Sequence, residues 1–121
     1  MTIADAIREA DRLKPNGFPT EDKLRWLERL ELRLREEVLG RCEGALPAWS
    51  PFEAGDLSRT LSAPAPYDEI YVHWLCAQMD YYEREPEGFN ASNAMFEALF
   101  RRFRNAYTRE HRPKSAGKQF N

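Results

Sequence analysis

Apolar residues recur at helical spacing in four separate stretches of the chain. These stretches cover residues 2–14, 20–39, 67–84 and 90–111. In each of them apolar side chains return every three or four residues, and in all but the third stretch polar or charged side chains occupy most of the positions between. This is typical of amphipathic helices that pack against a shared core, so the pattern predicts four α-helices.

Local signals indicate where these helices begin and end. Thr2 and Asp5 have the spacing of a capping box at the start of the first helix. Pro15 is expected to stop that helix, because proline disfavours helical backbone at the residue before it. Pro86-Glu87-Gly88 is expected to break the third helix, and Asn90 is expected to cap the fourth.

The helices differ in how much apolar surface they carry. The second has one clear face, formed by Leu24, Leu27, Leu30, Leu34 and Val38. The fourth has an aromatic stripe, formed by Met95, Phe96, Leu99, Phe100, Phe103 and Tyr107. The third helix is apolar around most of its circumference, which predicts that it is the central helix.

Residues 41–66 form a long connection between the second and third helices. Four prolines and two glycines rule out a long regular element there. Five large apolar residues make the connection too hydrophobic for a free linker: Leu46, Trp49, Phe52, Leu57 and Leu61. We expect an ordered loop with a short helical turn or a small strand pair, laid across the helices. Such long loops tend to carry function.

These elements predict an all-α fold, a small four-helix bundle. Residues 1–111 are expected to form one helical domain, since 121 residues is close to the usual size of a single domain. Residues 112–121 are expected to form a flexible basic tail.

The charge is distributed unevenly along the chain. The formal net charge is −2, but residues 101–121 carry seven Lys or Arg and one acid, so the first hundred residues carry −8. The chain contains no run of about 20 apolar residues, so we expect no membrane-spanning helix. The N-terminus lacks the basic-then-apolar order of a signal peptide, so the chain is expected to stay in the cytoplasm in which it is made.

The sequence contains no recognisable catalytic motif. There is no glycine-rich phosphate loop, and His73, Cys42 and Cys76 lack metal-ligand spacing. We therefore expect no cofactor, no metal, no disulfide and no enzymatic activity. Asp80 lies between apolar and aromatic residues, and we expect it to be partly buried and paired with an arginine.

Aromatic and arginine side chains are the candidates for contact with partners. Tyr81 and Tyr82 are neighbours that point about 100° apart on a helix, so at least one is expected to be exposed. The arginines of the fourth helix lie away from its aromatic stripe and could contact phosphates or acidic neighbours. The predicted partner-contact residues are Trp49, Phe52, Tyr81, Tyr82, Arg101, Arg102, Arg104, Arg109 and Arg112.

Several segments carry a resemblance to a known group of proteins. The run from Pro64 to Tyr71 reads Pro-x-Pro-Tyr-Asp-Glu-x-Tyr, the third helix ends near Asp80-Tyr81-Tyr82, and Asn90 and Asn93 follow. With the opening TIADAIREADRLKPN and the stretch TEDKLRWLERLELRLREEV, these resemble small structural proteins encoded in the head–tail region of long-tailed bacteriophages and prophages, chiefly those of Firmicutes.

The resemblance implies a head–tail connector, or head-completion protein, located in the virion. Such proteins are helical, form rings beneath the portal protein and extend the channel through which DNA passes. The implied partners are the portal, other junction proteins and further copies of the chain, with no sequence-specific DNA contact and no catalytic residues. A monomer in isolation is compatible with this role, because connectors often assemble only on their partner. We expect residues 101–121 to face the portal or a neighbour, because basic residues in the lumen would retard DNA.

The sequence is also compatible with two other classes of protein. A small DNA-binding or regulatory protein could use the basic face of the last helix, although no convincing helix-turn-helix is present. An enzyme with an unrecognised site ranks third.

Overall fold

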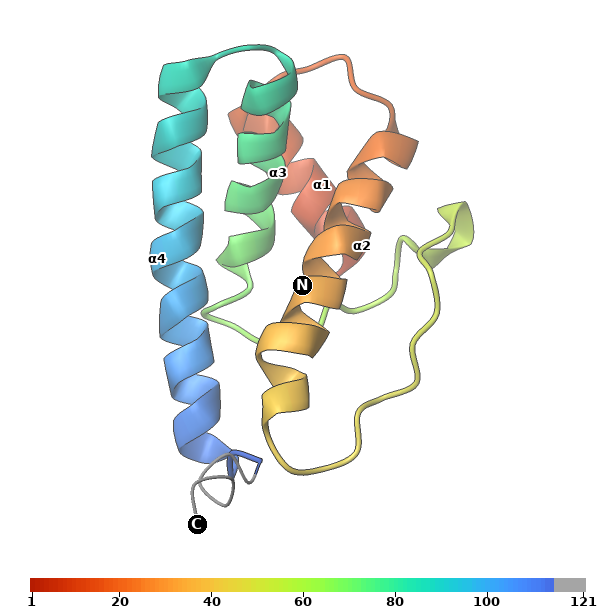
Figure 1. Ribbon diagram of the computed structural model, residues 1–121. Helices are drawn as coiled ribbons and strands as arrows, with labels where there is room; N and C mark the ends of the chain where they lie inside the picture. The colour runs from red at the N-terminus through yellow and green to blue at the C-terminus, as the bar shows by residue number, and fades with distance from the viewer. Residues whose placement is uncertain (115–121) are drawn as a thin grey trace.

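The computed structural model describes residues 1–114, and this part of the chain folds into an all-α bundle (Figure 1). The four helices are α1 (Ile3–Leu13), α2 (Thr20–Glu37), α3 (Glu69–Tyr82) and α4 (Pro86–Glu110). α4 is the longest and stands beside α3, while α1 and α2 cross on the other side of α3. The predicted all-α bundle is confirmed.

α3 is the central helix, as its nearly uniform apolar surface predicts. It packs against each of the other three helices. Eight of its residues are buried, and they include Ile70, Tyr71, Leu75 and Met79. α2 and α4 contribute one face each to the same core, which is why their apolar residues recur with a helical period.

The N-terminus of α1 is closed by a capping box and by the long loop. Thr2 accepts a hydrogen bond from the backbone of Asp5, and the Asp5 carboxylate accepts one from Thr2. The free N–H groups of Ile3 and Ala4 donate to backbone carbonyls of Arg59 (3.0 Å) and Leu57 (2.9 Å). The loop therefore satisfies backbone donors that a helix cannot satisfy by itself.

We call residues 42–66 the strap, because they run from the end of α2 across the bundle to the start of α3. A 3₁₀ turn at Leu39–Arg41 leads into the strap, and a second 3₁₀ turn lies within it at Ala54–Asp56. The predicted ordered loop with a short helical turn is confirmed. Its first residue, Cys42, forms an isolated antiparallel bridge with Pro113, after the end of α4.

The predicted start of the last helix is wrong. α4 begins at Pro86, so Pro86-Glu87-Gly88 starts this helix and Asn90 lies inside it. Proline is well suited to the first helical position, where its missing N–H has no intrahelical acceptor in any case. Only three residues, 83–85, then connect α3 to α4.

Two further predictions about the last segments need correction. Met95 is 57% exposed and does not belong to the buried stripe of α4, whereas Phe96, Phe100 and Phe103 do. Residues 112–114 are not a free tail, because Glu43 N–H donates to the Arg112 carbonyl and Lys114 N–H to the Arg41 carbonyl. Residues 115–121 of the predicted tail lie outside the described residues.

Candidate interaction surfaces

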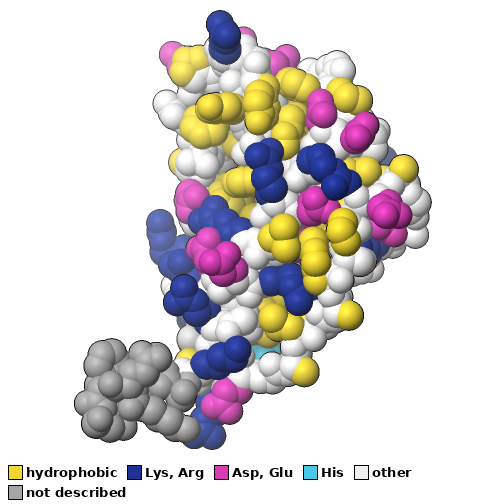
Figure 2. All heavy atoms as spheres, turned by 45° about the vertical axis from the view of Figure 1, so that its right-hand side comes forward, with side chains coloured by type: hydrophobic (Ala, Val, Ile, Leu, Met, Phe, Trp, Pro, Cys, Tyr) yellow, Lys and Arg dark blue, Asp and Glu magenta, His cyan; other side chains and the backbone are white. Residues whose placement is uncertain are grey.

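Exposed aromatic side chains gather at the turn from α3 into α4. We call residues 80–89 the α3–α4 corner. Tyr81 is 61% exposed and Tyr82 is 50% exposed. The prediction that at least one of them is exposed is therefore confirmed, and both are. Figure 2 shows hydrophobic side chains at the upper end of the molecule, with both acidic and basic side chains around them.

The exposed rings continue into a buried aromatic stack. Tyr82 lies flat against Trp26 with ring centroids 5.6 Å apart, and Phe18 meets the edge of Trp26 at 5.2 Å. On the other side Tyr81 contacts Tyr82 at 5.2 Å and Phe89 at 5.9 Å. Phe18 lies in the segment before α2, Trp26 in α2 and Phe89 in α4, so three parts of the chain support the two exposed tyrosines.

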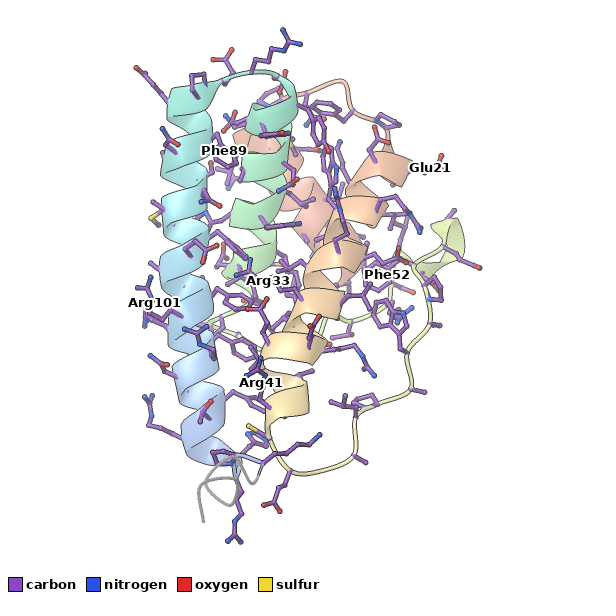
Figure 3. The ribbon with its side chains drawn as sticks, in the orientation of Figure 1. Glu21, Arg33, Arg41, Phe52, Phe89 and Arg101 are labelled. Atoms are coloured by element: carbon purple, nitrogen blue, oxygen red, sulfur yellow. The ribbon has the colours of Figure 1, made fainter. Side chains whose placement is uncertain are left out.

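An open groove of about 420 Å³ runs along the α3–α4 corner. Its walls are mainly apolar, and Figure 3 shows Phe89 between α3 and α4. The groove is lined by Asp80, Tyr81, Arg84, Glu85, Pro86 and Phe89. It offers aromatic surface beside the acidic Glu85 and the basic Arg84. The exposed acids Glu83, Glu85 and Glu87 outnumber Arg84 at this corner, and aromatic surface with an excess of acid suits a cationic side chain.

Asp80 is a buried carboxylate that holds this corner together. It is 1% exposed, and its Oδ1 lies 2.5 Å from Lys14 Nζ. The hydrogen bond to Asp80 raises the pKa of Lys14. We predicted an arginine partner, and this is wrong, because the chain that leaves α1 brings Lys14 to the end of α3.

Gly88 allows α4 to approach the same carboxylate. A Cβ at this position would lie 2.7 Å from Asp80 Oδ2 and 2.9 Å from its Cγ. Asp80 Oδ2 has no hydrogen-bond partner within the described part of the chain. It lies instead against the first turn of α4, where the helix dipole favours negative charge.

A basic surface lies on the other half of α4. Arg101, Arg102, Arg104 and Arg109 are all exposed, and none forms an ion pair with an acid among residues 1–114. Figure 3 shows Arg101 on the side of α4 that is turned away from α3. We call these four residues the arginine face. Arg112 differs, because its Nε lies 3.5 Å from Glu43 Oε1.

The strap uses its aromatic side chains internally. Phe52 is 1% exposed and belongs to the core. We predicted that Phe52 contacts a partner, and this is wrong, because its ring is buried. Trp49 is half-buried and packs 5.6 Å from Phe52. Arg59 lies over both rings, at 5.4 Å from that of Trp49 and 4.7 Å from that of Phe52.

Polar groups of α2 hold the backbone of the strap. Glu28 accepts a hydrogen bond from Phe52 N–H at 2.7 Å, and Arg25 donates to the Phe52 carbonyl. Arg35 donates to the Pro47 carbonyl at 2.9 Å. The middle of the strap is thus bonded to α2, and we find no unoccupied binding surface at Trp49 and Phe52.

A buried hydrogen-bond network that we did not predict ties the end of the strap to the core. Glu31 accepts bonds from the Tyr71 hydroxyl (2.5 Å) and from Ser62 Oγ (2.7 Å), and the Tyr71 oxygen accepts one from Ala63 N–H. Burial, with Glu31 adding to it, raises the pKa of Tyr71 well above its ordinary value. A signal was present, since Glu31 is in phase with Leu27 and Leu34 on the buried face of α2.

Residues 1–114 show no group of three or more His, Cys, Asp or Glu that could hold a metal ion. Cys42 and Cys76 are both buried free thiols, and burial raises the pKa of Cys76. His73 is half-buried. Over the same residues, no helix has the length and apolar character needed to cross a membrane.

Comparison with known proteins identifies no relative: no protein-family model matches the chain, and no curated protein or solved structure matches it.

Proposed function

We propose that this chain is a structural protein of a phage head–tail junction, which assembles as a ring on the portal protein and extends the DNA channel. The sequence resemblance supplies the biological context of this proposal. The observation that carries it is the presence of two unlike exposed surfaces on one bundle. One is the aromatic and acidic α3–α4 corner, and the other is the arginine face.

Two unlike surfaces are what a ring of identical subunits needs. In a ring each copy contacts its two neighbours through different patches, and the ring closes when the rotation between copies fits a full turn. Charge complementarity between the patches would select the correct partner and its orientation. A buried core with polar anchors for the strap suits a subunit whose shape must be constant around the ring.

Reconstitution with the portal tests this proposal. The chain would be co-expressed with the portal protein encoded beside it, and the purified complex would be imaged by electron cryomicroscopy. The expected result is a ring of copies below the portal that continues its channel. Failure to copurify, or a gene neighbourhood without portal or capsid genes, would contradict the proposal.

A second candidate function is binding to DNA through the arginine face. It is favoured by one observation, the four exposed arginines without an acidic partner among the described residues. Binding of this kind depends steeply on salt, because each phosphate contact releases a counterion. Fluorescence anisotropy on duplex DNA at several salt concentrations would measure it.

The decisive comparison uses a variant that lacks three of these charges. If the arginine face binds DNA, the Arg101→Ala/Arg102→Ala/Arg104→Ala variant should reduce the slope of log K against log salt by about 2 to 3. An unchanged slope and affinity, or no binding by the wild-type chain, would end this second candidate.

A further inference from the structure

The α3–α4 corner carries binding capacity that the described chain does not use. Its acids Glu83, Glu85 and Glu87 are exposed, and none forms an ion pair with a described cation. The groove beside Glu85 is lined by Tyr81, Phe89 and Arg84, and Arg84 is the one basic residue of the corner against these three acids. A cation that binds there would meet aromatic faces and a carboxylate together.

The rest of the molecule shows which cation this chain combines with aromatic rings. Arg33 lies 4.6 Å from the centroid of Phe100, and Arg35 and Arg59 lie 5.7 and 5.4 Å from that of Trp49. Guanidinium groups stack on rings and donate paired hydrogen bonds to carboxylates, which lysine does less well. The arginines of the arginine face contact no ring in residues 1–114.

These two surfaces cannot meet within one copy. Phe89 and Arg101 lie on the same helix, and twelve residues at 1.5 Å each separate them by about 18 Å along its axis. Arg109 is about 30 Å away from Phe89 by the same measure. Any contact between the α3–α4 corner and the arginine face must therefore join two copies.

We propose that the α3–α4 corner of one copy binds the arginine face of a second copy. Arginines of the second copy stack on Tyr81 and Phe89 and donate hydrogen bonds to Glu85. The contact is head-to-tail, so each copy has one such neighbour on each side. This inference rests on the proposed function, because it names the neighbour and the two surfaces within that assembly.

Reversing the charge on each surface gives a test with an internal rescue. Glu83→Arg/Glu85→Arg gives the corner three basic side chains against two acidic ones, and Arg101→Glu/Arg102→Glu/Arg104→Glu leaves the arginine face with three acidic side chains against one basic one. Each variant alone sets like charges against each other, so its self-association should weaken at least about tenfold. An equimolar mixture restores opposite charges at every junction, so the mixture should associate again.

Sedimentation velocity of the full chain over a range of concentrations measures the effect at low salt. The matched controls are Glu36→Arg and Arg29→Glu, which reverse exposed charges of α2 that lie in no ion pair of the described residues. These controls should associate like the wild type. Circular dichroism and the urea midpoint of each variant confirm that it is folded.

Three results would overturn the inference. They are a portal-bound ring in which the α3–α4 corner and the arginine face of neighbouring copies do not touch, association that neither charge reversal weakens, and a mixture of the two variants that stays dissociated. If the wild-type chain is monomeric by itself, copurification of each variant with the portal replaces sedimentation as the measurement. An arginine variant that changes only DNA binding would likewise assign that face to nucleic acid.

Failure of this inference and failure of the proposed function give different results. A ring on the portal built from other surfaces would overturn the corner contact and leave the proposed function standing. Charge-swapped assembly by a chain that does not bind a portal would do the reverse.

Discussion

The strap and the α3–α4 corner are two connections between helices, and they are opposites. The strap spans residues 42–66, whereas only residues 83–85 separate α3 from α4. The strap buries Phe52 and covers its rings with Arg59. The corner exposes Tyr81 and Tyr82 and leaves three acids without an ion pair to a described cation.

This difference shows that the length of a loop is a poor guide to where a protein leaves aromatic and acidic surface exposed. We expected function in the strap because it is long and contains Trp49 and Phe52, which we predicted to contact a partner. Its backbone is instead hydrogen-bonded by side chains of α2, and Phe52 is buried in the core. The short corner has the unused hydrogen-bonding and aromatic surface that a partner can bind.

The largest expected loss of stability comes from a substitution that removes the anchor of the strap. Phe52→Ala removes a ring that is fully enclosed by α2 and the strap, so the free energy of unfolding should fall by about 3 kcal/mol. Urea denaturation followed by circular dichroism measures this. Leu46→Ala, at an exposed position of the same strap, should change it by less than about 0.5 kcal/mol. Equal effects of the two substitutions would show that Phe52 is not an anchor.

Alkaline pH should reduce the stability that Tyr71 contributes at the strap and that Lys14 contributes at the α3–α4 corner. One variant, Tyr71→Phe, distinguishes the two contributions. The pKa of Tyr71 is raised by burial and that of Lys14 by its hydrogen bond to Asp80, so the folded chain holds both protons above pH 10 while the unfolded chain loses them. Stability is therefore complete below about pH 10 and falls as the pH rises further. Tyr71 alone should cost up to about 1.4 kcal/mol per pH unit.

Urea midpoints between pH 8 and about pH 11.5 test this linkage. Tyr71→Phe should reduce the slope above pH 10 and leave the part that Lys14 contributes at the corner. A slope that Tyr71→Phe does not alter would contradict the role of the Tyr71–Glu31 bond in holding the strap.

A smaller effect is expected from filling the space between α4 and Asp80. Gly88→Ala places a methyl group against a buried carboxylate that Lys14 holds in position. Overpacking of this kind costs about 1–3 kcal/mol, and the better helix propensity of alanine returns about 1 kcal/mol. We expect a net loss of about 1 kcal/mol in the free energy of unfolding.

Gly17→Ala is the matched control, because no atom lies within 4 Å of the position that its Cβ would occupy. It should leave the urea midpoint unchanged or raise it slightly. A stabilising Gly88→Ala would mean that Asp80 can move aside, and that the close approach of α4 to Asp80 is not required.

Substitution of Tyr81 is expected to have the smallest effect on stability among these changes and the largest effect on self-association. Tyr81→Ala should change the free energy of unfolding by less than about 1 kcal/mol, because most of this ring is in solvent. Self-association, measured by sedimentation velocity, should weaken at least about tenfold. Trp49→Ala should do the opposite, lowering stability more than association. If Trp49→Ala abolished association, the strap would be the interface after all.

Much of the secondary structure could be predicted from local signals. The capping box at Thr2 and Asp5 forms as its spacing predicts. α2 buries Leu24, Leu27, Leu30 and Leu34, because a helical period brings them to one face whatever they pack against. The start of α4 could not be predicted in the same way, since proline ends a helix or begins one depending on its neighbours.

The partners of individual side chains were beyond local reasoning. Asp80 was expected near an arginine and lies against Lys14, a residue 66 positions earlier in the chain. Phe52 and Tyr81 are both aromatic residues beside polar ones, yet the first is enclosed and the second is exposed. Nothing within a few residues of either position distinguishes these two environments.

By itself, the sequence determined that this protein has four helices, of which three are amphipathic and the central one is apolar on most sides, and a basic end. Those properties depend on spacing along the chain, and each segment carries them independently. Only the tertiary structure decided that the strap is anchored to α2 and that the α3–α4 corner is exposed. The physical reason is that burial and hydrogen bonding are shared between residues distant in sequence, such as Glu31 with Ser62 and Tyr71.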